Sequence, residues 1–349
     1  MLVGRPALTS RERLVLYGLV RWPHLGDVGL GEVLGLGRTT VTVIRRRLVG
    51  HGLVEGFLVP DFGRVGCELL TALYGEFSGA ASHGLDAFKA VVRDGVGSAF
   101  YMVRFGGQHL SLGAARNLTQ VGEAISAHHR VHHESGYLTD RRHNYVFFPL
   151  KLTNIPRFFD YAPLLAKEFG LEYRPDRVTA SKAVDWKPTR RERGVYTALV
   201  SLPEASDEKV AAKAGVSRQT VNVLRNRFLG SGLLRPLKIP DVSRLGFGLL
   251  AFTHLHMSPH VGRDGRKKHT ESVLEDCAHV LKVSGDLESV LLSFHKDYGD
   301  YRRSHERLLG VYRKNRLLSD DPVVKLFPLL GTDQLLNHRY GNVLSGFGD

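Results

Sequence analysis

The chain has 349 residues, 43% of them hydrophobic and 24% charged, so it has enough apolar material for a core, and a disordered or collagen-like chain is excluded. Its 48 Lys and Arg against 35 Asp and Glu give a net charge of +13, which favours a polyanionic partner such as nucleic acid. The two cysteines, Cys67 and Cys277, are too few for a disulfide framework or a four-thiolate zinc site, and they favour a cytoplasmic location. We expect neither a signal peptide nor a membrane partner, because no apolar run reaches the length of either segment.

Three helices are expected at the start of the chain. Thr9 precedes the first helix, and Glu12 stands at the capping-box spacing. A second helix is expected after a cap at Asp27, and a third from Arg38 to about Gly50. The turn between the second and third helices has the glycine that a left-handed backbone favours, so the pattern predicts a helix-turn-helix.

A βαββαβ pattern is expected to follow. The alternating segment 52–60 predicts a pair of short wing strands. Strands and helices are then expected at 69–77, 85–93, 99–104, 109–114, 121–133 and 145–150. This order is the split βαβ plan.

The whole pattern occurs twice. Residues 9–73 align with 189–253 at an offset of 180 without a gap, and 25 of the 65 positions are identical. The match returns later at an offset of 179, where Phe148-Pro149-Leu150 aligns with Phe327-Pro328-Leu329. The second copy predicts its own sheet and helix elements at 249–256, 271–277, 279–283, 288–294, 301–314 and 323–329. We therefore expect two copies of one unit, not a short-period solenoid.

The fold class predicted is α+β, with two tandem copies of a winged helix-turn-helix followed by a ferredoxin-like βαββαβ domain. The expected division is 1–60 and 61–173 for the first copy, a linker at 174–188, and 189–240 and 241–349 for the second copy. The linker is polar and bounded by prolines.

The third helix of each copy carries arginines and no acidic residue, which suits a phosphate backbone. Docking geometry predicts base contacts for one set of side chains: Arg38, Thr39, Thr42, Arg46, Arg218, Gln219, Asn222 and Asn226. A second set is predicted to contact phosphate: Arg45, Arg47, Arg225 and Arg227. The alternative for this surface is a winged helix used for protein contact.

These motifs resemble the leucine-responsive/asparagine-regulator (Lrp/AsnC) family of prokaryotic transcription regulators. The resemblance is carried by 217–221, 232–234, Ile239-Pro240-Asp241 and 244–247. It implies a sequence-specific DNA-binding regulator, archaeal or bacterial, with double-stranded DNA as partner and a small-molecule effector of unknown identity. Because both copies share one chain, we expect an intramolecular pseudo-dimer, or a homodimer or higher assembly of such chains.

An enzyme branch of the same fold, the siroheme decarboxylases, gives the alternative function. The sheet domains show no repeated histidine–arginine constellation of the tetrapyrrole type, so the expectation from sequence is that the chain is not an enzyme, has no catalytic residues and binds no cofactor. The histidine-rich stretch offers i, i+4 pairs that could chelate a metal: His128, His129, His132 and His133. A solvated histidine face is the preferred interpretation, and no metal site is predicted.

Overall fold

The computed structural model describes residues 7–77, 98–134, 136, 143–173, 186–262, 265–266, 279–344 and 347. It is a mixed α/β structure with two five-stranded antiparallel sheets. The chain forms two compact units from alternating stretches: 1–56, 153–178 and 237–330 make unit 1, and 57–152, 179–236 and 331–349 make unit 2. No helix in the described ranges is both long and apolar enough to cross a bilayer.

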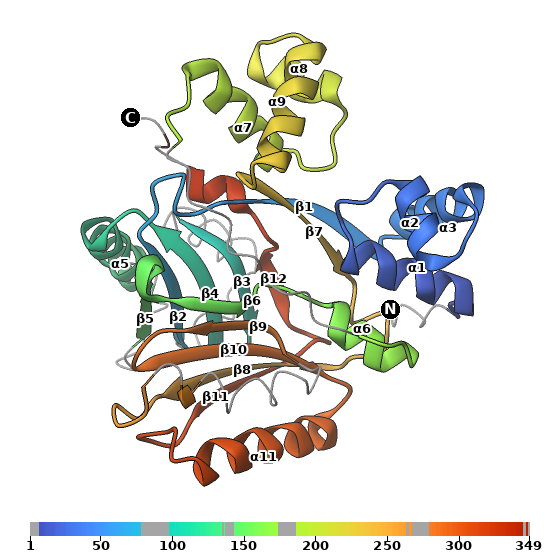
Figure 1. Ribbon diagram of the computed structural model, residues 1–349. Coiled ribbons are helices and arrows are strands. Elements are labelled where there is room, and N and C mark those ends of the chain that lie inside the picture. The colour runs from blue at the N-terminus through green and yellow to red at the C-terminus, as the bar shows by residue number, and fades with distance from the viewer. Residues whose placement is uncertain are drawn as a thin grey trace. The chain divides into compact units, whose positions relative to one another are not determined.

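Unit 1 contains a group of three helices, here called head 1: α1 (Ser10–Arg21), α2 (Asp27–Leu34) and α3 (Arg38–Gly50). Its sheet has the order β11 (Val323–Pro328), β8 (Leu249–His256), β10 (Glu288–His295), β9 (His279–Ser284) and β6 (Asn154–Arg157). Helix α11 (Tyr298–Lys314) covers one face of this sheet (Figure 1). Leu308 and Tyr312 of α11 pack there against Leu255 and Leu291.

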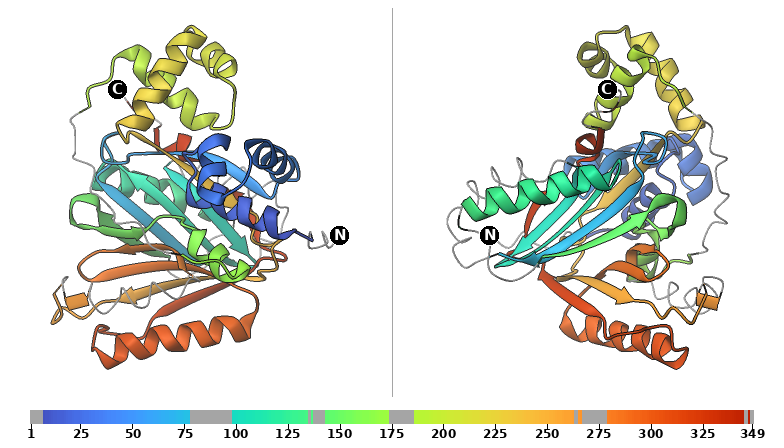
Figure 2. Two further views of the ribbon diagram at one scale, coloured as in Figure 1. Left: turned by 45° about the vertical axis from the view of Figure 1, so that its right-hand side comes forward. Right: turned by 90° about the vertical axis from the view of Figure 1, so that its left-hand side faces the viewer.

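Unit 2 contains the corresponding head 2: α7 (Arg190–Ser201), α8 (Asp207–Ala214) and α9 (Arg218–Gly230). Its sheet has the order β12 (Asp333–Leu336), β3 (Ala99–Phe105), β4 (Gln108–Ala115), β2 (Leu69–Glu76) and β5 (Asn144–Pro149). Helix α5 (Leu118–Glu134) lies across one face of this sheet (Figure 2). The short 3-10 helices η2 (Leu150–Leu152) and η3 (Tyr340–Leu344) complete the unit.

The fifth strand of each sheet was not predicted, and each comes from the other sequence copy. Strand β6 of the first copy pairs with β9 of the second, and β12 of the second copy pairs with β3 of the first. The wing prediction was also inaccurate: β1 (Val54–Pro60) and β7 (Leu234–Pro240) pair with each other rather than forming a strand pair within each copy. The expected helices at 85–93 and 271–277, and most of the predicted linker, lie outside the described residues.

Each head is packed by the chain that follows the exchanged strand. In unit 1 this is α6 (Ala162–Phe169), which contacts α1 and β9, and Tyr17 Oη of α1 donates to the Glu172 carbonyl at 3.2 Å. In unit 2, η3 contacts α7 and β3, and Phe347 packs with Trp186 and with Tyr196 of α7. The exchange therefore joins each head to the sheet of the opposite sequence copy.

Two of the four residues predicted as helix N-caps occupy the N-cap position in the structure. Thr9 and Thr189 each form a capping box, with Glu12 and Glu192 respectively. The caps predicted at Asp27 and at its counterpart in the second copy are wrong, because the N-cap residues are Gly26 and Ser206. The two aspartates are the first helical residues instead, which leaves their carboxylates available to the third helices.

The aspartate carboxylates hold the second helix of each head to the third. Arg45 Nε lies 2.8 Å from Asp27 Oδ1, and an Arg45 amino group also donates to the Leu25 carbonyl at 3.1 Å. Head 2 repeats the arrangement with Arg225 and Asp207 at 2.8 Å. All four side chains are less than a third exposed, so water screens these pairs less than it screens surface pairs.

Arg45→Ala is expected to lower the free energy of unfolding of head 1 by about 1–2 kcal/mol, because it leaves a partly buried carboxylate without its cation. Arg46→Ala, one residue along the same helix and exposed, is the matched control and is expected to change stability by less than about 0.5 kcal/mol. Urea denaturation with hydrogen exchange of the α2 and α3 amides measures both. Equal effects of the two variants would contradict a structural role for Arg45.

A buried histidine near η3 gives a pH-dependent contribution to stability. His338 is 3% exposed, its Nδ1 lies 3.0 Å from Tyr340 Oη, and its ring packs on those of Phe57 and Tyr101. Burial lowers the pKa of His338 to about 3. The imidazole takes up a proton near pH 6.5 in the unfolded chain but not in the folded chain. The contribution of neutral His338 to the free energy of unfolding is therefore lost as pH falls from about 6.5 towards 3.

His338→Phe is expected to remove this pH dependence while keeping the packing, because the first copy has Phe159 at the corresponding position with the same left-handed backbone (φ 51° in both). Between pH 6.5 and 5 the wild type should lose about 2 kcal/mol more unfolding free energy than the variant. Urea denaturation at the two pH values measures the difference. Parallel pH profiles would show that His338 does not remain neutral in the folded chain.

Candidate nucleic-acid interface and a buried histidine cluster

The side chains predicted to contact bases from α3 lie along one strip of the helix. Arg38, Thr39 and Arg46 are exposed, whereas Thr42 is half-buried and its Oγ1 donates to Asp27 Oδ2 at 2.7 Å. Val43 lies in the same strip and is 60% exposed, which sequence analysis did not single out. Residues spaced by three, four and seven share one face of a helix, so 39, 42, 43 and 46 form one surface.

Helix α9 repeats this surface with different polar groups. Arg218, Gln219, Asn222 and Asn226 are all exposed, and Val223 is 60% exposed, like its counterpart Val43. The Asn222 amide donates to Asp207 Oδ2 at 3.3 Å, and the Asn226 amide donates to Asn222 Oδ1 at 3.3 Å. The aspartate at the start of the second helix thus orients a side chain on the exposed strip of each head.

The four arginines predicted to contact phosphate all take part in ion pairs within their own heads. Arg45 and Arg225 bind the two aspartates described above. Arg47 lies 2.8 Å from Glu12, and Arg227 pairs with Glu192, so the two capping-box acids each hold an arginine of the third helix. Arg47 and Arg227 are half or more exposed and can still present a charge to a ligand, whereas Arg45 and Arg225 are largely covered.

The aspartate–arginine pairs could have been found in the sequence. Asp27 and Asp207 are identical between the copies, and so are Arg45 and Arg225, which follow 18 residues later in each case. From sequence alone, the two aspartates are predicted as helix caps and the two arginines as phosphate contacts. The structure adds that the two positions are in direct contact.

A second group of candidate functional side chains lies in unit 2, between α5 and the sheet. His109 of β4, His128 of α5 and His143 before β5 are buried, and one ring nitrogen from each lies within 4.8 Å of the others. His132, one turn after His128, is also buried, with the two ring centroids 4.1 Å apart. We call these four residues the histidine cluster.

The predicted histidine face is therefore only partly solvated. His128 and His132 point into the cluster, His133 is exposed, and His129 bonds through Nε2 to Tyr145 Oη at 3.0 Å. His109 and His143 were missed, because they are distant in sequence and only the sheet brings them to α5. Burial lowers the pKa of His128 to about 2 and those of His132 and His143 to about 4, so these rings are neutral at pH 7.

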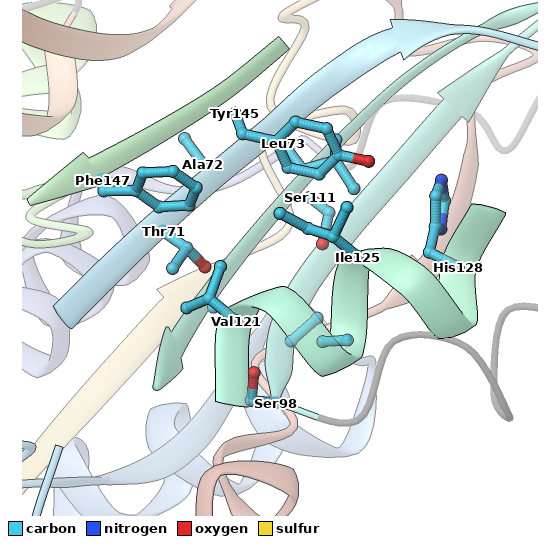
Figure 3. A pocket seen from close by; sticks show the side chains of 13 residues that line it. Thr71, Ala72, Leu73, Ser98, Ser111, Val121, Ile125, His128, Tyr145 and Phe147 are labelled. Atoms are coloured by element: carbon cyan, nitrogen blue, oxygen red, sulfur yellow. The ribbon is translucent and has the colours of Figure 1, made fainter. Parts of the chain in front are cut away.

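A small pocket of about 60 Å³ adjoins the cluster on the same face of the sheet, below the roughly 300–1,000 Å³ of typical small-molecule sites. Figure 3 shows Val121, Ile125 and His128 projecting from α5 towards the strands that carry Ser111 and Tyr145. The lining is mostly apolar, with the hydroxyls of Thr71, Ser98, Ser111 and Tyr145 and the imidazole of His128 as its polar groups. It can therefore hold a small, largely apolar ligand.

Unit 1 has its own histidine pair, already satisfied by a carboxylate. Glu288 Oε2 lies 2.6 Å from His254 Nε2 and 3.2 Å from His256 Nδ1. Burial lowers the pKa of His254, and the hydrogen bond to Glu288 opposes that effect. These residues form a polar group on the sheet face opposite Leu255.

Comparison with known proteins identifies the fold. Neither protein-family models nor curated proteins gave a match. Among solved structures, the siroheme decarboxylase NirDL matches 96% of this chain and 98% of its own chain, with TM-score 0.52 and 10% identity. A structure of NirDL in co-complex with an iron-uroporphyrin III analogue matches 92% of each chain, with TM-score 0.49 and 10% identity. An AsnC family transcriptional regulator from Agrobacterium tumefaciens matches 40% of this chain and 90% of its own, with TM-score 0.33 and 18% identity.

These findings correct two expectations from sequence. From sequence we expect that the chain is not an enzyme. The comparison contradicts this expectation, because NirDL, which shares this architecture over nearly the whole chain, is an enzyme. The expectation of no cofactor is contradicted by the same comparison, because that enzyme is described as a siroheme decarboxylase. At 10% identity the likeness shows the fold alone: this chain has the AsnC/Lrp-like fold of NirDL.

Proposed function

We propose that the chain is a sequence-specific DNA-binding regulator, cytoplasmic and prokaryotic, with the three helices of head 1 and of head 2 acting as helix-turn-helix modules beside two ferredoxin-like sheet domains. One observation supports this proposal: α3 and α9 expose corresponding strips of the side chains that are predicted to contact bases, and neither helix contains an acidic residue. Arginine matches guanine, and asparagine and glutamine match adenine. The net charge of +13 adds a sequence-independent attraction to the phosphate backbone.

The exposed valines extend this proposal. Val43 and Val223 sit at the centre of their strips, and each of these apolar side chains is 60% exposed. The thymine methyl group is the apolar feature of the major groove, so each valine would contact thymine beside the polar contacts. Thr39, Thr42 and Arg46 differ from Gln219, Asn222 and Asn226, which favours a DNA site with two unlike halves.

The chain would act as an intramolecular pseudo-dimer. The support is the reciprocal exchange of β6 and β12, which builds each unit from both sequence copies and supplies within one chain the pairing that two chains supply in a dimer. The pocket beside α5 would be the place of the small-molecule effector of such a regulator, since its lining is mostly apolar with a few hydroxyl groups and one imidazole.

Arg46→Ala and Asn222→Ala are each expected to cost about 1–3 kcal/mol of binding to the preferred DNA and to relax sequence preference. Arg47→Ala is expected to weaken binding to all DNA alike and to reduce the salt slope by about 1. Fluorescence anisotropy with DNA from upstream of the gene and with scrambled DNA, at two salt concentrations, measures these effects.

Arg302→Ala is the control for charge, because Arg302 is an exposed arginine of α11 outside both heads. It should leave the preference unchanged. Equal losses from Arg46→Ala, Asn222→Ala and Arg47→Ala on every sequence would contradict the assignment of roles, and no difference between upstream and scrambled DNA for the wild type would leave only nonspecific binding.

A second candidate function is action on an iron tetrapyrrole, as in the siroheme decarboxylase that shares the fold. The imidazoles beside the pocket favour it, since histidine is a common ligand of haem iron. The described pocket lining contains no arginine or lysine to balance the carboxylates of such a substrate, so the fit is incomplete. Decarboxylation would replace a carboxylate by a proton with release of carbon dioxide.

Adding siroheme or iron-uroporphyrin III to the full chain tests this second function. Binding through the cluster should shift the Soret band, and His128→Leu should abolish that shift because it removes an imidazole. Mass spectrometry of the tetrapyrrole then reports any loss of carbon dioxide. An unchanged spectrum with unchanged substrate mass would exclude the activity.

A further inference from the structure

We propose that the histidine cluster of unit 2 binds one divalent transition-metal ion of the zinc type, with His109, His128 and His143 as its ligands. The proposal depends on neither function proposed above. It rests on the placement of the three imidazoles, on the polar atoms buried there, and on a comparison with the same place in the other sequence copy.

The geometry is close to that of a three-histidine site. The three nitrogens come from three separate elements and lie within 4.8 Å of one another. Ligands at the 2.0–2.1 Å of Zn–N bonds in a tetrahedral site would be about 3.4 Å apart. To reach that spacing, each nitrogen would have to move by less than about 1 Å on metal binding. Three protein ligands leave a fourth position for water or an external ligand.

The burial of these rings lacks another explanation in the described residues. Neither ring nitrogen of His128 or of His143 has a hydrogen-bond partner in the described part of the chain. A buried donor or acceptor without a partner is unfavourable, and native proteins rarely leave several together. Coordination to a cation would satisfy one nitrogen of each ring, and the neutral imidazole is the form that binds metals.

The second copy shows what this place contains when no site is present. Corresponding residues of the two copies are 180 positions apart. This offset holds for the bounds of α5 and α11, and for the strand pairs β2–β4 and β8–β10. His128 and His132 correspond to Leu308 and Tyr312, which belong to an apolar cluster of unit 1 together with Leu255 and Met257. In unit 1 this position holds a leucine and a tyrosine, and the Tyr312 hydroxyl accepts from the buried Lys282 ammonium at 3.2 Å, whereas unit 2 holds histidines.

Gly75 makes room for the imidazoles. It corresponds to Leu255, and a Cβ added at Gly75 would lie 3.1 Å from His143 Nδ1 and 3.3 Å from His109 Cε1. The rings therefore pack directly on the backbone of β2, where the other copy has a leucine side chain. Unit 2 thus has a glycine where unit 1 has Leu255, and it has histidines at the positions that contact this glycine. This combination indicates a built site.

The metal ion in question is identified by its donors. An all-imidazole set with no carboxylate in the group suits Zn²⁺, Ni²⁺, Cu²⁺ or Fe²⁺ rather than Mg²⁺ or Ca²⁺, which prefer oxygen. Co²⁺ is a suitable probe, because it takes similar sites and absorbs visible light when four-coordinate. The site on His254, His256 and Glu288 differs in having a carboxylate, so variants can separate the two.

The test is a titration of the full chain, without a histidine tag and freed of metal by a chelator, with Co²⁺ alone. We expect one Co²⁺ per chain with visible d–d absorption. His128→Leu should weaken binding at least about 100-fold, at or beyond the 10–100-fold that is typical of losing an outer-shell partner. It should still fold, because leucine occupies the corresponding position of the other copy, and circular dichroism and urea denaturation check this.

Two controls keep the result specific. His133→Leu, on an exposed position of the same helix, should leave Co²⁺ affinity unchanged. His254→Tyr, which inserts the residue of the first copy at that position, should also leave it unchanged. The proposal is overturned if the wild type binds no Co²⁺, if folded His128→Leu binds it equally, if His254→Tyr loses it, or if the chain binds iron-uroporphyrin III through His128 but not the bare metal ion.

Discussion

The exchange of β6 and β12 is the constraint on which the rest of the molecule depends. The edges of β9 and β3 expose a row of backbone N–H and C=O groups, and each edge is completed by four residues from the other sequence copy. The chain that follows each exchanged strand then packs against a head. Each five-stranded sheet therefore contains residues of both copies, and each head is packed with the sheet of its partner copy.

Within each head, one aspartate decides how the exposed surface is arranged. Asp27 and Asp207 bind an arginine on the covered side of the third helix and a polar side chain on its exposed side. The charge of Arg45 and Arg225 is thereby used inside the head, and the charge that faces solvent comes from other positions. In sequence, the charged residues of α3 and α9 are all positive. In three dimensions, acidic residues of α1 and α2, and of α7 and α8, partly balance these charges.

The two copies have kept the same framework and diverged inside it. Strand register, helix bounds and the left-handed glycines Gly35 and Gly215 agree between them. The space under the helix of the sheet domain does not: it is apolar beneath α11 and lined by histidines beneath α5. The two units therefore differ at a few contacting positions, with candidate ligands in unit 2 alone of the two, and the architecture shared with an enzyme shows that this fold can carry chemistry.

The sequence by itself determined the duplication, the three helices of each head and most strands, because these follow from local periodicity, caps and glycine turns, and α3, α9 and β8 occupy the residue ranges expected of them. It did not predict β6 and β12, which are four residues long and owe their structure to a distant partner strand. It also could not bring His109 and His143 to His128, since the three lie on separate elements and only sheet pairing joins them. Local chemistry fixed the elements, and long-range pairing decided which side chains share a site.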